Sequence, residues 1–506
     1  MRTRILAVWV SILAAAFVVV PYSHAIPPFS RLYGTSCATC HLDFPKLNDF
    51  GKAFKDAGFK FPKNDEDFIK IPPVMLGAPA QKEMWPAKAI YPGTLPGIPQ
   101  LGLRFNTFFQ VYSRNRNTLV PPQVDGTAGA TFTPRADFQP GLFSIFTAGN
   151  FGDGIAFWVD DDFSVGGANA AGSLGDGYLK FVDIGRLFKL PTDSLSLRVG
   201  QFEIDLPFSQ ARTWNLSGWD IYDEANFGAA SQLGVTGVNN AFAFSTPGQG
   251  VEFSGGHNYG GYHYSLAVLN QSTNPNGPPG AGPNVSPIVG TFSDSNFKDL
   301  YGRFQYRFNL ERDATSRNDI QAAGPSGPRD HTYLQLGTYY FYGRSVQRFQ
   351  GESGVLTARE PFYRTGGDFS FNYRTFNLFG LYMYGHDKNL EPNGSGGLST
   401  DPMPAKFNGG FLEADYLALP WLMAIMRYDR VQSEADFLNG PGSSNYFSPA
   451  SATRNRVTPG VQFLIHANIK ASFEYQVRPQ QTGTDINGNT QTPRTNQAVA
   501  GLEWVY

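Results

Sequence analysis

From about residue 100 onward, apolar and polar residues alternate along segments of roughly ten residues. In one segment Arg303, Gln305 and Arg307 fall on one face, whereas Phe304 and Tyr306 fall on the other. A period of two is the repeat of a β-strand. Alternating segments of this length are the sequence signature of a transmembrane β-barrel, with one face toward lipid and the other toward a polar lumen.

The alternation defines sixteen candidate strands between residues 101 and 506. They lie near 101–113, 140–149, 153–165, 175–185, 193–204, 248–256, 261–271, 298–309, 331–342, 365–374, 376–386, 407–417, 420–430, 455–466, 467–478 and 496–506.

The links between these segments mostly alternate in length. Long links are expected at 272–297, 343–364, 387–406, 431–454 and 479–495, and very short ones at 257–260, 375, 418–419 and 466–467, with 310–330 long where a short turn is expected. Outer-membrane barrels have short periplasmic turns and long outer loops, and an even strand number returns both barrel ends to the periplasm. Residues 99–506 are therefore predicted to form a mainly β fold, a 16-stranded antiparallel outer-membrane barrel of porin type.

Composition agrees with this prediction. The chain has 43 Phe and 24 Tyr, and only 16% of its residues are charged. A soluble β-sandwich is the alternative, but it does not explain the alternating links. A helical membrane protein is excluded because no apolar run of spanning length follows residue 25. The formal charge of −2 and the lack of a basic run exclude a nucleic-acid interface.

Residues 1–25 have the features of a secretory signal peptide. Arg2 and Arg4 precede an apolar run from Ile5 to Val20, and small residues end the segment at Ala25. Cleavage after Ala25 is expected, with an uncleaved membrane anchor as the alternative. Export through this signal would deliver the barrel to the Gram-negative outer membrane.

The sequence Cys37-Ala-Thr-Cys40-His41 is a C-x-x-C-H motif, which attaches haem c. The two thiols add to the haem vinyl groups and His41 becomes an iron ligand. Cys37 and Cys40 are the only cysteines in the chain. The alternatives are a thioredoxin-type redox pair, a single disulfide or chance.

Residues 26–98 are predicted to be a small α-helical monohaem segment. Asp43 is expected as an N-cap, with Pro45 in the first turn and Gly58 as a C-terminal cap. The spacing of Phe44, Leu47, Phe50 and Phe54 is close to helical, so these side chains are expected to cover the porphyrin or simply to pack on whatever lies beneath. Residues 71–99 are rich in Pro and Gly and are expected to be an extended linker.

The sequence leaves the identity of the sixth iron ligand undecided. Met75 follows Ile71-Pro-Pro-Val in a stiff loop and is the first candidate, and Met84 is the second. A methionine opposite histidine raises the reduction potential of the iron. An open site, a barrel histidine, or packing roles for both methionines are the alternatives.

Three further features are candidate sites. Asp160-Asp161-Asp162 ends a predicted strand and is either a solvated strand end or a cation site. The long segment 205–247 is expected to fold inward as a constriction or to cover the haem. Five histidines are scattered without metal-ligand spacing, although a lumen-facing His263 would approach the haem from below: His257, His263, His331, His386 and His466.

The run 29–41, FSRLYGTSCATCH, followed by 44–54, FPKLNDFGKAF, resembles the haem segment of the outer-membrane cytochrome–porin fusions, best known from iron-oxidising bacteria. The resemblance implies one covalently bound haem c at or in the barrel mouth, held by Cys37, Cys40 and His41. It also implies electron transfer from extracellular Fe(II) toward periplasmic c-type cytochromes or another electron carrier. A diffusion porin with a redox-sensing haem, and outward electron transfer, are the alternatives.

A potentiometric titration of the purified protein, followed through the visible haem bands, tests this interpretation. With Met75 opposite His41 we expect a clearly positive potential and the spectrum of a methionine ligand, because a thioether stabilises the reduced iron. A strongly negative potential would disfavour iron as the donor. A chain without covalent haem would contradict the motif assignment.

Overall fold

In the computed structural model, the described residues are 28–43, 45–72, 74–75, 94–95, 101–112, 136–152, 154–164, 173–209, 213, 215–227, 244, 247–270, 297–310, 332–351, 354–388, 405–433, 447–449, 453–478, 483–485, 490–491 and 496–506. Residues 1–27 lie outside this set, so the signal peptide stays a prediction.

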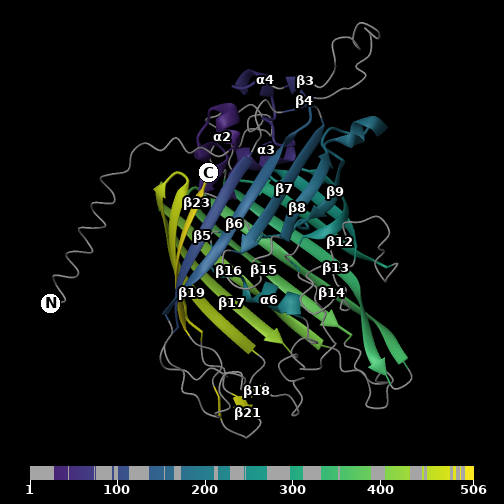
Figure 1. The fold of residues 1–506 in the computed structure, drawn as a ribbon, viewed down its shortest axis with the longest axis vertical. Helices are drawn as coiled ribbons and strands as arrows, with labels where there is room; N and C mark the ends of the chain where they lie inside the picture. Colours follow the sequence, from purple (N-terminus) through teal and green to yellow (C-terminus); the bar gives the residue numbers. More distant parts are fainter. Residues whose placement is uncertain are drawn as a thin grey trace, which may run out of the picture.

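The described strands close into one antiparallel barrel of sixteen, as predicted (Figure 1). The ladder runs in chain order and is sealed where β23 pairs with β5. The barrel strands are β5 Leu101–Tyr112, β6 Ala136–Asn150, β7 Ile155–Ser164, β8 Ser173–Phe181, β9 Ser196–Phe202, β10 Gly248–Gly256, β11 Gly261–Asn270, β12 Lys298–Asn309, β13 Tyr333–Gly351, β14 Gly354–Tyr373, β15 Phe376–Asp387, β16 Ala405–Leu419, β17 Leu422–Ser433, β19 Thr453–His466, β20 Ile469–Gln476 and β23 Gln497–Val505.

The smaller elements lie at the N-terminus and in the links. They are α2 Pro28–Tyr33, η1 Cys37–Thr39, β1 His41–Asp43, β2 Lys46–Leu47, α3 Asp49–Asp56, α4 Asp65–Phe68, β3 Val74–Met75, β4 Thr94–Leu95, η2 Ile184–Phe188, α6 Asp220–Phe227, β18 Phe447–Pro449, β21 Gly483–Asp485 and β22 Thr490–Gln491.

The barrel wall is polar inside and apolar outside. On β12, Arg303 and Arg307 are buried toward the lumen, whereas Phe304 is 50% exposed on the outer surface. β17 repeats the pattern with buried Arg427 and exposed Met426. A water-soluble protein has the reverse distribution, and an apolar outer band is what a lipid-spanning barrel requires.

Exposed aromatic side chains gather at the ends of the strands that border the short turns. This set consists of Tyr262, Tyr306, Phe308, Tyr373, Tyr416, Trp421 and Tyr506. Aromatic girdles of this kind mark the boundary between lipid tails and headgroups. We call this set the short-turn girdle.

One predicted link is wrong. Residues 343–364, expected as a long loop, continue β13 and β14 to the pair Gly351–Gly354, so the two strands form the longest hairpin of the barrel (Figure 1). Cross-strand pairs such as Ser345–Glu360 and Arg348–Thr357 consist of polar residues. The alternation of apolar and polar residues is interrupted here, so the sequence pattern does not reveal this part of the ladder. The other predicted long links lie largely outside the described residues.

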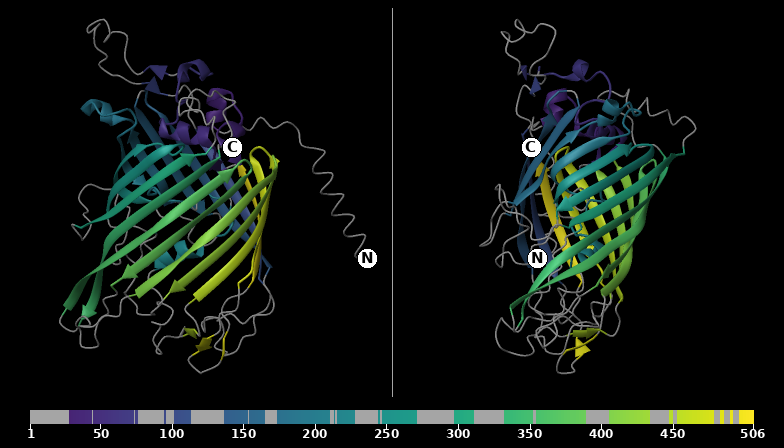
Figure 2. Two further views of the ribbon diagram at one scale, coloured as in Figure 1. Left: turned by 180° about the vertical axis from the view of Figure 1, so that it is seen from behind. Right: turned by 90° about the vertical axis from the view of Figure 1, so that its right-hand side faces the viewer.

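The N-terminal segment, residues 28–72, sits in the mouth of the barrel at its short-turn end (Figures 1 and 2). We call it the plug. Asp49 of α3 receives two hydrogen bonds from Arg307 of β12, both at 2.7 Å, and both side chains are fully buried. The Arg307 guanidinium also lies 3.6 Å from the centre of the Tyr333 ring. This buried pair joins the plug to the inner wall.

Three further contacts surround that ion pair. Lys46 donates to Asn377 at 2.8 Å, and Asp56 accepts from the Asn258 side chain at 3.2 Å. At the seam of the barrel, Arg31 donates to the Leu101 carbonyl at 2.8 Å and lies 5.3 Å from the centre of the Tyr506 ring. The plug is therefore held on several sides of the lumen.

The segment after β9 folds inward, as predicted, and carries α6 into the lumen (Figure 1). Trp219 stacks on Phe411 at 4.6 Å and donates to Glu413 at 3.1 Å. Asp220 pairs with Arg456 at 3.0 Å. These bonds fix the inward segment, residues 203–209 and 215–227, against the opposite wall and narrow the channel.

Among the described residues, no helix has the length and apolar character needed to cross a membrane.

Substituting Asp49→Ala should loosen the plug, because it leaves the buried Arg307 charge without its closest partner. Removing one member of a buried pair costs about 3–5 kcal/mol. We expect faster proteolytic cleavage within residues 28–72 and a higher single-channel conductance. The matched control is Asp67→Ala on exposed α4, which should change neither the cleavage rate nor the conductance. Equal cleavage rates in both variants would show that the pair does not hold the plug.

Candidate haem site

The two cysteines of the motif lie on one short 3₁₀ turn. The Cys40 amide donates to the Cys37 carbonyl at 3.2 Å, which brings the two residues to the same side of the chain. Both thiols are free and half-buried. Burial raises the pKa of both thiols, that of Cys40 to about 12. A reduced, unpaired dithiol at this spacing is what covalent attachment to two vinyl groups requires.

The His41 ring is held by the chain that follows it. Its Nδ1 lies 3.2 Å from the Pro45 carbonyl oxygen, which can only accept, so Nδ1 carries the proton. Burial lowers the pKa of His41 to about 4, and the imidazole is therefore neutral at pH 7. A neutral imidazole with Nδ1–H committed to a carbonyl keeps the Nε2 lone pair for a metal.

Asn48 ties the motif loop to α3. Its side-chain amide donates to the carbonyls of Ala38 and Thr39 at 3.2 and 3.0 Å, and its Oδ1 accepts from the Gly51 amide at 2.8 Å. The Asn48 backbone amide donates to the Cys40 carbonyl at 2.9 Å. One residue thus caps the helix and closes the loop.

Gly51 allows this approach. A Cβ atom at this position would lie 2.1 Å from the Cys40 carbonyl oxygen. Neither Asn48 nor Gly51 is predicted above, although an Asn directly before a helical pattern is itself a cap signal.

The predicted start of the helix is wrong. Asp43 is the end of β1, which pairs with β2 in a small hairpin, and α3 begins at Asp49 with Asn48 as its N-cap. Pro45 lies in that hairpin, where its carbonyl oxygen contacts the His41 ring. The predicted C-terminal cap is confirmed, since Gly58 has φ 81° and the Phe59 amide donates to the Phe54 carbonyl at 2.9 Å.

The predicted aromatic face of the helix packs into an aromatic cluster. Phe50 and Phe54 are buried, and Tyr33 stacks on Phe61 with ring centres 4.3 Å apart. The cluster reaches the barrel wall through Phe59, which lies 5.7 Å from Trp158. Leu47 is half-buried and Phe44 lies outside the described residues. Ordinary packing is thus observed, and contact with a porphyrin stays a prediction.

The candidates for the sixth ligand keep their status as predictions. Met75 lies on β3, paired with β4, but only its backbone is described. Met84 lies outside the described residues, as does His331. The remaining barrel histidines have other neighbours: His263 lies 3.1 Å from Asp205, His466 lies 2.6 Å from Asn468, His257 lies 3.6 Å from Asp193 and His386 stacks on Tyr363.

No metal-binding cluster of three or more His, Cys, Asp or Glu side chains occurs in the described part of the chain. Asp160 and Asp162 lie within β7 rather than at its end. They accept hydrogen bonds from the Asp176 amide and the Ser144 hydroxyl, respectively. Two of the three carboxylates proposed for a cation site therefore already accept hydrogen bonds from groups of the barrel wall.

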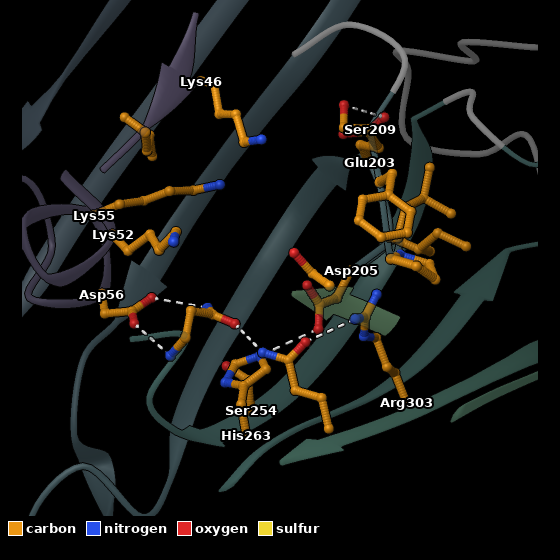
Figure 3. A pocket seen from close by; sticks show the side chains of 18 of the residues that line it. Lys46, Lys52, Lys55, Asp56, Glu203, Asp205, Ser209, Ser254, His263 and Arg303 are labelled. Atoms are coloured by element: carbon orange, nitrogen blue, oxygen red, sulfur yellow. Dashed lines mark hydrogen bonds and ion pairs between the residues drawn. The ribbon is translucent and has the colours of Figure 1, made fainter. Parts of the chain in front are cut away.

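A cavity of about 320 Å³ lies beneath the plug (Figure 3). Its charged lining comes from the plug, the inward segment and the wall, and the labelled members are Lys46, Lys52, Lys55, Asp56, Glu203, Asp205, His263 and Arg303. Arg303 pairs with Asp368 at 3.0 Å, and Asp205 with His263 at 3.1 Å. Because these residues come from distant segments, sequence analysis did not bring them together.

The donor set of the motif fits a c-type haem. Two free thiols three residues apart and a neutral histidine with a committed Nδ1 would supply both attachments and one axial ligand.

No protein-family model and no curated protein sequence matches the chain. Solved structures similar to its fold include the anion-selective porin from Comamonas acidovorans, at 11% identity over 80% of this chain and 98% of that one with a TM-score of 0.44. Another is OmpF of Salmonella typhi in complex with daunomycin, at 11% identity, 81% and 98% coverage and a TM-score of 0.45. OprB of Pseudomonas putida matches at 9% identity, 80% and 94% coverage and a TM-score of 0.45. This likeness concerns the fold alone, and the closed strand order carries the assignment.

Asn48→Ala should destabilise the motif loop, because it removes the helix cap and two bonds to loop carbonyls. We expect the plug to lose about 1–2 kcal/mol of stability. The measurement is the temperature at which protease begins to cleave within residues 28–72, and this temperature should fall. The control is Asn64→Gly, which keeps the left-handed backbone at a position without a side-chain cap bond. If both variants release residues 28–72 to protease at the same temperature, the side chain of Asn48 does not stabilise the motif loop.

Proposed function

We propose that this chain is an electron conduit of the Gram-negative outer membrane. In this proposal residues 26–98 form a monohaem c-type cytochrome seated in the mouth of the barrel. The observation that carries it is the buried Asp49–Arg307 pair, which fixes the segment bearing Cys37, Cys40 and His41 to the inner wall. A haem motif fixed in a barrel mouth would face the periplasm on one side and the lumen on the other, a position that a free periplasmic cytochrome lacks.

The residues of the plug prepare the site in three ways. Pro45 orients His41 through Nδ1, and Asn48 holds the loop between the cysteines. The aromatic cluster beside Cys40 keeps this side of the motif apolar. When bound, the haem supplies one-electron, outer-sphere redox chemistry with no substrate bond made or broken.

The two ends of the barrel suggest the partners. The plug lies at the short-turn end, which in outer-membrane barrels faces the periplasm. A periplasmic c-type cytochrome or another carrier is the proposed partner there, and extracellular Fe(II) is the proposed donor at the opposite end. Outward transfer through the same site remains the reverse alternative.

A diffusion porin with a structural or redox-sensing haem is the second candidate. A 16-stranded barrel encloses a lumen wide enough for water, and this lumen is lined by charged side chains. The plug and the inward segment both narrow it, which limits the size of any solute that could pass. Liposome swelling with sugars separates the two, because rapid permeation with the plug intact would favour the porin.

His41→Ala tests the conduit directly. We expect electron uptake from an external donor to be lost while the barrel stays folded, as judged by its heat-modifiable migration, because the iron loses its protein ligand. His386→Ala is the matched control, since His386 lies near the opposite end of β15 and only stacks on Tyr363. Normal uptake in the His41 variant would refute the proposal.

A further inference from the structure

The turn between β8 and β9, residues 182–195, presents an apolar group on the outside of the protein. Leu187 is 80% exposed, Phe188 67% and Leu190 45%. Single exposed apolar residues are common on protein surfaces, but three within four positions mark an interaction site. Arg186 and Lys189, both exposed, are interleaved with them.

The turn is built to hold this group in place. The Ser196 hydroxyl accepts from the Asp183 amide at 3.0 Å, and the Asp183 carboxylate accepts from the Asp193 amide at 2.8 Å. The Leu190 amide returns to the Gly185 carbonyl at 3.0 Å. Asp183, Lys189 and Asp193 all adopt left-handed backbone conformations. Three non-glycine residues in this region are unusual and indicate a conformation imposed by the surrounding bonds.

Contacts with neighbouring strands fix the position of the turn along the barrel axis. Tyr264 of β11 donates to the Ser194 carbonyl at 2.8 Å, and the Gly256 amide donates to the Asp193 carbonyl at 2.8 Å. Tyr262, two positions from Tyr264 on the outer surface, belongs to the short-turn girdle. The turn therefore lies at the level of the lipid headgroups.

The turn also lies at the same end of the barrel as the plug. A Cβ atom at Gly58 would lie 3.0 Å from a methyl group of Val182, where the turn begins. Figure 2 shows the segment leading into β9 projecting from the rim, away from the barrel axis.

We propose that this turn is an interfacial anchor for anionic phospholipid of the adjoining leaflet. Leu187, Phe188 and Leu190 insert at the boundary of headgroups and acyl chains, and Arg186 and Lys189 bind lipid phosphates. Alternating apolar and basic side chains next to an aromatic girdle match this chemistry. Arg186 pairs with Asp183 of the same turn, yet its side chain stays 71% exposed and within reach of a lipid phosphate. A second copy of the chain docked through the same turn would bury the apolar group but would set the basic side chains of the two turns against one another. The inference is independent of the haem.

The test places a fluorescent probe at the tip of the turn in the full-length protein. Phe188→Trp is reconstituted in vesicles of phosphatidylglycerol and phosphatidylcholine, and its emission is read as the difference from the parent protein. We expect a blue-shifted component that brominated acyl chains quench and aqueous iodide does not. Lys63→Trp, on the exposed surface of the plug, is the control and should show the reverse pattern.

Two outcomes would overturn the proposal. Quenching of the Phe188→Trp component by iodide alone would place the turn in water. A blue shift without quenching by brominated lipid would mean that another protein surface, such as a second copy, covers it.

The charge component is tested by Lys189→Glu in the Phe188→Trp background. Quenching by brominated acyl chains in phosphatidylglycerol vesicles should fall toward the level seen in phosphatidylcholine vesicles. Unchanged quenching would show that Lys189 does not bind the lipid phosphate.

Discussion

Closure of the strand ladder is the constraint on which the rest of this structure depends. In a hydrocarbon surrounding, each backbone amide and carbonyl needs a partner within the protein, and a closed barrel alone provides this for strands. With a period of two, closure also divides every strand into an outer and an inner set of side chains. The apolar outside and the charged lumen of this barrel are two results of one geometric requirement.

The charged lumen in turn determines how the plug and the inward segment are held. Both pack aromatic side chains on the wall, and both are also fixed to it by ion pairs and hydrogen bonds. Arg427 donates to Asp429 at 3.0 Å and to the Ser217 carbonyl at 3.0 Å, and Arg307 serves Asp49 in the same way. Buried pairs of this kind add little net stability but penalise every misplaced arrangement. They specify the position of the plug and of the inward segment in the lumen.

The sequence pattern was sufficient for the barrel because lipid enforces the alternation on which strand prediction relies. It failed at residues 343–364, where polar cross-strand pairs interrupt that alternation. In the plug, Asp43 and Pro45 have the residue types of a helix start, but the chain forms the β1–β2 hairpin there and the helix begins six residues later. Asn48 is a local cap signal, whereas its bonds to the motif loop and the partner of Asp49 depend on contacts between separate segments. Cys37, Cys40 and His41 follow from the spacing of one short motif, and their role with haem stays a prediction.

The position of Arg31 has a consequence for assembly. This residue touches the start of β5 through the Leu101 carbonyl and the end of the β23 edge through the Tyr506 ring, so its two contacts lie on opposite sides of the seam. Both contacts can exist only once the first and last barrel strands are neighbours. Final seating of the plug is thus a late event in biogenesis, and an unclosed barrel carries a plug that is still accessible from the periplasm. The seam contact thus links closure of the barrel to the final seating of the plug.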